Sequence, residues 1–110
     1  MQVRETETKR AGFYAWGAAR DAAIKSYAAS TTYSDAQKLK AERVKLGLEL
    51  CYHSRAIRIN FRNKWITVHI EEPQVRDVRN LALLEADYEL QGISKSVNKD
   101  GDISYRIMRA

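Results

Sequence analysis

The chain has 110 residues, of which 45% are hydrophobic and 30% are charged, and its formal net charge is +5 at pH 7. This length predicts one domain over residues 1–110, and the balance of apolar and charged residues excludes an intrinsically disordered chain. No run of about 18 apolar residues is present, so we expect no membrane partner. A basic protein of this size is expected to contact a polyanion such as nucleic acid, or an acidic or nucleoprotein partner.

The single cysteine, Cys51, excludes an intramolecular disulfide and is typical of a protein in the reducing cytoplasm. The charged first residues, MQVRETETKR, predict no signal peptide. Positive charge is concentrated in one part of the chain. Residues 38–70 hold 8 Lys and Arg against 2 Asp and Glu, whereas residues 71–110 hold 6 against 8. Any surface for a polyanion is therefore expected within residues 38–70.

Two helices are expected in the first half of the chain. Residues 4–29 are rich in alanine and carry a core-facing stripe at helical spacing, formed by Phe13, Trp16, Ala19, Ala23 and Tyr27. Ser34 and Gln37 match a capping box and predict the start of a second helix, over about residues 35–52. Its apolar side is expected along the line of Leu39, Arg43, Leu46 and Leu50, with Ala36, Val44 and Leu48 beside it. The short loop predicts an antiparallel αα-hairpin.

Residues 56–70, AIRINFRNKWITVHI, predict a β-hairpin. With a period of two, one face is entirely apolar and consists of Ile57, Ile59, Phe61, Ile66, Val68 and Ile70. Asn63-Lys64 is expected to form the turn, which pairs Arg62 with Trp65, Asn60 with Thr67 and Arg58 with His69. A slip of one residue would mix the two faces, so the register is strongly specified.

The rest of the chain predicts a helix and a second hairpin. Pro73 suits the first position of a helix over about residues 73–89, whose apolar side is Val75, Val78, Leu81, Ala82, Leu84 and Tyr88. Lys99-Asp100-Gly101 predicts the loop of a hairpin over residues 90–108 that pairs Val97 with Ile103, Lys95 with Tyr105 and Ile93 with Ile107.

The order ααββαββ predicts an α+β fold in which helices cover one face of an antiparallel sheet. Two separate hairpins would be marginally stable, so a joined four-stranded sheet is expected. Whether the hairpins join within one chain or pair across a homodimer stays open at this point.

The second face of the first hairpin carries the residues that we expect to bind nucleic acid. Arg58, Arg62 and Lys64 supply charge for phosphates, Trp65 offers a ring for base stacking, and Asn60, Thr67 and His69 add hydrogen-bonding groups. Four basic residues of the second helix extend this site: Lys38, Lys40, Arg43 and Lys45. In a competing structural interpretation, Arg62 packs over Trp65 as a cross-strand cation–π pair, and the face has no ligand.

The leading hypothesis is a small non-enzymatic protein that binds nucleic acid or a nucleoprotein. One alternative is a protein-directed inhibitor or adaptor, such as a phage-encoded host-takeover or anti-defence factor, because Arg and Trp are frequent interface anchors. Another is a metal-independent, toxin-like ribonuclease that uses Arg58, Arg62, His69 and Tyr105.

Neither a catalytic nor a cofactor motif is present, since the chain contains no Gly-rich phosphate loop, GxSxG or HExxH. We therefore expect no catalytic residue, no metal and no cofactor. Cys51 lies at the apolar end of the second predicted helix, where we expect a buried, inert thiol.

Overall fold

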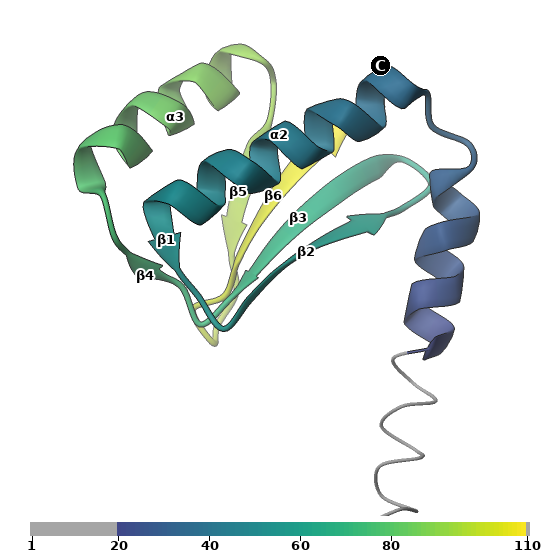
Figure 1. The fold of residues 1–110 in the computed structure, drawn as a ribbon, viewed down its shortest axis with the longest axis horizontal. Helices are drawn as coiled ribbons and strands as arrows, with labels where there is room; N and C mark the ends of the chain where they lie inside the picture. Colours follow the sequence, from purple (N-terminus) through teal and green to yellow (C-terminus); the bar gives the residue numbers. More distant parts are fainter. Residues whose placement is uncertain (1–19, 110) are drawn as a thin grey trace, which may run out of the picture.

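The computed structural model describes residues 20–109, whose arrangement is shown in Figure 1. Residues 20–30 are helical. Two further helices and six strands follow: α2 (Asp35–Cys51), β1 (Tyr52–His53), β2 (Ala56–Phe61), β3 (Trp65–Glu71), β4 (Gln74–Val75), α3 (Val78–Leu90), β5 (Ser94–Val97) and β6 (Ile103–Met108). The predicted α+β class is confirmed.

The strands form a four-stranded antiparallel sheet in the order β2-β3-β6-β5 and a two-stranded sheet of β1 and β4. Helices α2 and α3 lie side by side over one face of the larger sheet (Figure 1). The two hairpins join within one chain through β3 and β6, which answers the question that the sequence left open.

The first helix departs from its prediction in the part that the structure describes. It runs away from α2 at the end of the sheet instead of lying along it (Figure 1). Tyr27 is 74% exposed and so does not belong to the core. Phe13, Trp16 and Ala19 lie outside the described residues. The contact of this helix with the sheet includes a hydrogen bond from the Phe61 N–H to Ser26 Oγ, at 3.0 Å.

Helix α2 begins with the predicted capping box, because Ser34 Oγ accepts from the Gln37 N–H and Gln37 Oε1 accepts from the Ser34 N–H. The prediction of its core side was right for Val44 and Leu48 and wrong for the line of Leu39, Leu46 and Leu50. The buried residues are Ala41, Val44, Leu48 and Cys51, whereas Leu39, Leu46 and Leu50 are exposed. The buried residues and the exposed leucines each lie along one side of the helix, but Arg43 lies in the line of the leucines. Burying its unpaired charge would be unfavourable, so the uncharged line faces the sheet.

The first hairpin has the predicted register, with Arg58 opposite His69 and Asn60 opposite Thr67. The Arg62 N–H donates to the Trp65 carbonyl at 2.9 Å, which closes the two-residue turn. The predicted apolar face points toward the helices: its β3 residues are buried and its β2 residues are partly buried against the core. Alternation of side chains along paired strands is therefore sufficient to explain both faces.

The second hairpin is confirmed in its loop and in most of its pairs. Gly101 has a φ of 86°, in the left-handed region, as the predicted three-residue loop requires. Val97 lies opposite Ile103 and Lys95 opposite Tyr105. The predicted pairing of Ile93 with Ile107 is wrong, because β5 begins at Ser94 and the Ile93 N–H instead donates to the Tyr88 carbonyl.

Helix α3 starts at Val78 and not at Pro73. Its N-cap is Asp77, whose side chain accepts from the Asn80 N–H at 3.1 Å. Gln74 and Val75 form β4, which pairs with β1, and the Cys51 carbonyl accepts from two N–H groups just before α3. The helix therefore starts later than Pro73 predicted, because Asp77 is a better N-cap and because β4 pairs with the distant strand β1.

Candidate nucleic-acid interface

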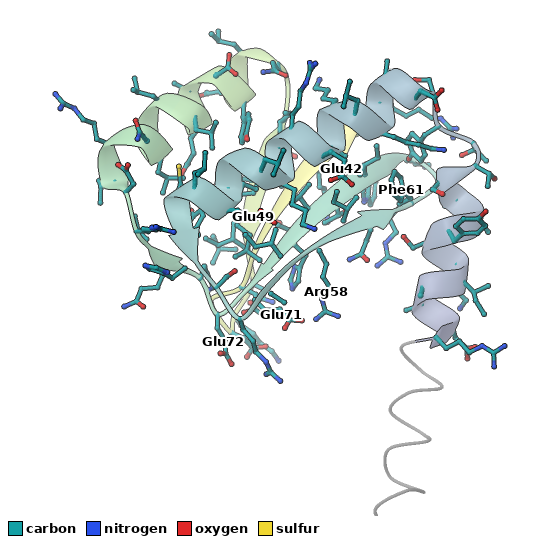
Figure 2. All side chains as sticks on the ribbon, in the orientation of Figure 1. Glu42, Glu49, Arg58, Phe61, Glu71 and Glu72 are labelled. Carbon is teal, nitrogen blue, oxygen red and sulfur yellow. The ribbon has the colours of Figure 1, made fainter. Side chains whose placement is uncertain are left out.

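The face of the four-stranded sheet opposite α2 and α3 is polar, and we call it the open face. Because Ile66, Val68 and Ile70 are buried, the alternate residues of β3 must lie on this side. Figure 2 shows Arg58 and Glu71 projecting from this side of the sheet, away from α2. Cross-strand pairing places residues of three strands on the open face. They are Arg58 and Asn60 of β2, Arg62 just after β2, Trp65, Thr67, His69 and Glu71 of β3, and Ser104 and Arg106 of β6.

Five of the predicted site residues line one shallow hollow on the open face: Asn60, Arg62, Trp65, Thr67 and His69. Two unpredicted residues, Ser104 and Arg106, complete this lining. They come from β6, where Ser104 lies opposite His69 and Arg106 opposite Thr67. The sequence contains the signal that could have found them, since Ile103, Tyr105 and Ile107 alternate along the predicted strand with Ser104 and Arg106, which therefore lie on the other face.

The cation that lies over the Trp65 ring is Arg106, whose Cζ is 4.6 Å from the indole centroid. The competing interpretation is therefore wrong about the partner, because the cation–π pair with Trp65 is formed by Arg106 and not by Arg62. Arg106 lies opposite Thr67 and is a diagonal neighbour of Trp65, a separation that a long side chain can span. This contact leaves the Arg62 side chain exposed.

Ion pairs neutralise one end of the open face. Arg58 forms an ion pair with Glu71, and Arg55 lies 3.8 Å from Glu72 at the same end of the sheet. We call the other end, next to the Asn63-Lys64 turn, the turn end; it consists of Arg62, Lys64, Trp65 and Arg106. Within residues 20–109, none of these three cations forms an ion pair with a carboxylate. The uncompensated charge of the open face therefore lies at the turn end.

The turn itself is held by Arg109 and Tyr33. The Arg109 N–H donates to the Lys64 carbonyl at 3.1 Å, and its Nη1 donates to the Asn63 carbonyl at 3.0 Å. The guanidinium lies over the Tyr33 ring, 4.5 Å from its centroid, and the Tyr33 hydroxyl donates to the Arg62 carbonyl. The backbone of the turn end is therefore fixed before any ligand arrives, which lowers the entropic cost of binding.

The four predicted basic residues of α2 do not share the open face, because α2 packs on the opposite side of the sheet (Figure 1). Three of them, Lys38, Lys40 and Arg43, are separated from Trp65 by the sheet. Lys45 lines a groove at the β2 edge that Arg58 and Asn60 also line, and its Nζ lies 3.9 Å from Glu49. The open face is therefore completed by β6, and of the four predicted α2 residues only Lys45 shares a groove with predicted residues of the hairpin.

His69 lies between two polar side chains on the open face. Its Nδ1 is 2.8 Å from Ser104 Oγ, and its Nε2 is 4.0 Å from Asp102 Oδ2. The other oxygen of Asp102 accepts a hydrogen bond from the Glu72 N–H at 3.0 Å. Ser104 is thus the hydrogen-bond partner of the ring, and Asp102 lies on the side of its other nitrogen, beyond hydrogen-bond distance.

Tyr105 lies apart from the other three residues of the ribonuclease hypothesis, Arg58, Arg62 and His69, which all lie on the open face. Tyr105 is 1% exposed, on the helix-covered side of the sheet, and its hydroxyl lies 3.4 Å from that of Tyr52. Burial raises the pKa of Tyr105 above its ordinary value, which disfavours loss of the hydroxyl proton. Strand alternation explains the separation, because Tyr105 and its neighbour Ser104 must point to opposite faces.

Cys51 is buried, and burial together with the nearby Asp77 and Glu85 raises the pKa of its thiol. Both effects disfavour the reactive thiolate. Among residues 20–109, no three His, Cys, Asp or Glu side chains are grouped as a metal site would require.

No helix in the described part of the chain combines the length and the apolar character needed to cross a bilayer. Comparison with protein-family models, with curated proteins and with solved structures finds no match for this chain.

Proposed function

We propose that this protein is a non-enzymatic nucleic-acid-binding protein and that it binds through the turn end of the open face. The observation that carries the proposal is a tryptophan flanked by cations that have no carboxylate partner among the described residues, Arg62 and Arg106. Such cations bind phosphates, and bases stack on guanidinium planes as well as on aromatic rings. Asn60 and Thr67 line the same hollow and add hydrogen-bonding groups.

The charge pattern distinguishes a nucleic-acid-binding surface from an ordinary solvated sheet face. Basic strand residues often serve only to discourage edge-to-edge aggregation. The charge of Arg58 is balanced within the protein, since it pairs with Glu71. At the turn end, however, positive side chains converge around an aromatic ring without a balancing carboxylate in the described chain. An extended polyanion would supply the missing charge.

The test is a salt titration of binding to labelled single-stranded and duplex DNA and RNA. Binding should weaken as salt is raised, because phosphate contacts release counterions. Arg62→Ala with Arg106→Ala should weaken binding and make the plot of log K against log salt shallower. The slope should fall by roughly 0.7 for each single-strand phosphate that the double variant no longer neutralises.

The matched control is Arg76→Ala with Arg79→Ala, which removes the same charge from exposed positions near and on α3. This variant should bind nearly as the unmodified protein does. Absence of binding even at low salt would contradict the proposal, as would an equal loss of binding in both double variants.

A second candidate function, a protein-directed inhibitor or adaptor, is supported by the outer side of α2. Leu39, Leu46 and Leu50 lie in one line there and are 52%, 59% and 73% exposed. Leucines at such spacing can anchor a helix in a partner's groove. A pull-down from nuclease-treated lysate separates the two functions. A partner that survives nuclease and is lost in Leu46→Glu favours this second function, whereas recovery that nuclease abolishes favours nucleic acid.

A further inference from the structure

His69, Ser104 and Asp102 form a chain of polar contacts across β3 and β6 on the open face. Nδ1 of His69 meets Ser104 Oγ at 2.8 Å, and Nε2 faces Asp102 Oδ2 at 4.0 Å. Asp102 is held in place by the Glu72 N–H. His69 and Ser104 also line the hollow that contains Trp65 and Arg62, so the contacts open onto the proposed nucleic-acid site.

The hydrogen-bond roles in these contacts depend on the protonation of His69. No hydrogen bond joins Nε2 to Asp102 at 4.0 Å, but the carboxylate charge on that side electrostatically favours the neutral imidazole that carries its proton on Nε2. Nδ1 must then accept, and the Ser104 hydroxyl must donate its proton inward. When the ring takes up a second proton from solvent, Nδ1 becomes a donor and Ser104 Oγ becomes the acceptor. The Ser104 hydroxyl keeps its proton and can rotate its O–H bond toward the open face.

We propose that His69 and Ser104 form a proton-gated subsite for a backbone phosphate of a single-stranded nucleic acid. The proposal rests on the proposed function. Protonation of His69 adds one positive charge and turns one hydroxyl donor outward, and both changes favour a phosphate oxygen. Along β3 the subsite lies four residues from Trp65, or about 13 Å at 3.3 Å per residue, so it contacts a different nucleotide from the stacked base.

The charged groups that face His69 define the strength of this gate. On β2, Arg58 is directly opposite, but Glu71 of β3 pairs with it. Beside β6, Asp102 favours the protonated ring, while Arg106, one pair further along the strand, opposes it. An arriving phosphate adds a negative charge to this set and so favours the protonated ring. Phosphate binding and proton uptake therefore strengthen each other.

The experiment measures binding of oligothymidylate, whose bases do not titrate in this range, at pH 5.5 and pH 8.0 and at constant ionic strength. The unmodified protein should bind roughly tenfold more tightly at the lower pH, the scale of one charge-assisted hydrogen bond. His69→Gln should bind equally at both pH values, and Ser104→Ala should show a reduced ratio. His53→Gln removes the other histidine, which is exposed on β1, and should retain the full ratio.

Binding that does not depend on pH, or a pH dependence that His69→Gln leaves intact, would overturn this inference alone. Absence of binding at both pH values would overturn the proposed function and this inference with it. A second measurement needs no ligand: ring-nitrogen chemical shifts of His69 at pH 8.0 should report the Nε2–H tautomer. The Nδ1–H tautomer would contradict the assigned direction of the Ser104 hydrogen bond and would also overturn the inference.

Discussion

The guanidinium of Arg106 lies over the indole of Trp65, with its Cζ 4.6 Å from the ring centroid. The two residues come from β6 and β3, strands whose partnership joins the two hairpins of the fold. The contact both shields an apolar ring and leaves an exposed guanidinium at the surface. The junction of the hairpins thus creates the feature on which the proposed binding surface is centred.

Replacing Arg106 with lysine should separate the contribution of stacking to single-strand affinity from the contribution of charge. Lysine keeps the positive charge but lacks the planar group that stacks on rings, so Arg106→Lys should weaken single-strand binding by about two- to fivefold. Arg62→Lys is the matched control, because Arg62 does not stack on Trp65, and its affinity should change less than about twofold. Affinities would be measured by fluorescence anisotropy at one salt concentration. Equal effects of the two substitutions would contradict the stacking role.

The turn end should lose stability when Arg109 is removed. Arg109→Ala deletes hydrogen bonds to the Asn63 and Thr32 carbonyls and the cation over the Tyr33 ring. The expected loss in the free energy of unfolding is about 1–2 kcal/mol, measured by urea denaturation. Arg79→Ala, at an exposed position on α3, should change stability by less than about 0.5 kcal/mol. A variant at position 109 as stable as this control would show that the turn does not depend on the Arg109 side chain.

The first hairpin could be predicted down to its register, whereas the partners of its residues could not. Isoleucine, valine and phenylalanine alternate with polar residues on both sides of Asn63-Lys64, so only one register separates the faces. Nothing within residues 56–70 indicates that β6 lies beside β3, and so Arg106 was not expected over Trp65. Local alternation determines which face a side chain occupies, and long-range strand order determines what it touches.

Prediction of the helices was limited in the same way, because local features were predictable and contacts between distant parts of the chain were not. The capping box of α2 was predictable because Ser34 and Gln37 are three residues apart and act locally. The buried side of α2 was not, since two apolar lines compete and only the rest of the fold selects between them. The start of α3 was missed because Gln74 and Val75 pair with β1, a contact between distant parts of the chain.

Helix α2 also contains a glycine that packing requires. A Cβ at Gly47 would lie 2.8 Å from the Tyr88 hydroxyl oxygen and 3.2 Å from Leu84 Cδ1. Helix propensity alone predicts that Gly47→Ala stabilises by about 1 kcal/mol, but overpacking of a buried contact should reverse the sign and destabilise by about 1–3 kcal/mol.

A double-mutant cycle tests this interpretation of Gly47. Tyr88→Phe removes the hydroxyl, which donates to the Val44 carbonyl at 3.2 Å, and so opens space for a methyl group. Gly47→Ala should therefore be less damaging in the Tyr88→Phe background, with a coupling above about 0.5 kcal/mol in urea denaturation. Additive effects, or a stabilising Gly47→Ala in the unmodified protein, would show that the close approach is not limiting.

Stability should fall at alkaline pH because of the buried tyrosines. Burial, with smaller contributions from Cys51 and Asp87, raises the pKa of Tyr88 from its ordinary value of 10.0 to about 12. Below pH 10 the tyrosine is protonated in both the folded and the unfolded state, so its full contribution to stability is present. Between pH 10 and 12 the unfolded state releases the proton while the folded state retains it. The free energy of unfolding therefore decreases through this window.

For Tyr88 alone this decrease should reach on the order of 2–3 kcal/mol by pH 12, and urea denaturation at pH 8, 10 and 11 would follow its course. Tyr88→Phe should make the decrease smaller, although not abolish it, because burial also raises the pKa of Tyr105. Tyr27→Phe, at a tyrosine that is 74% exposed, should leave it unchanged. If Tyr27→Phe and Tyr88→Phe altered the alkaline decrease equally, burial of Tyr88 would not be its cause.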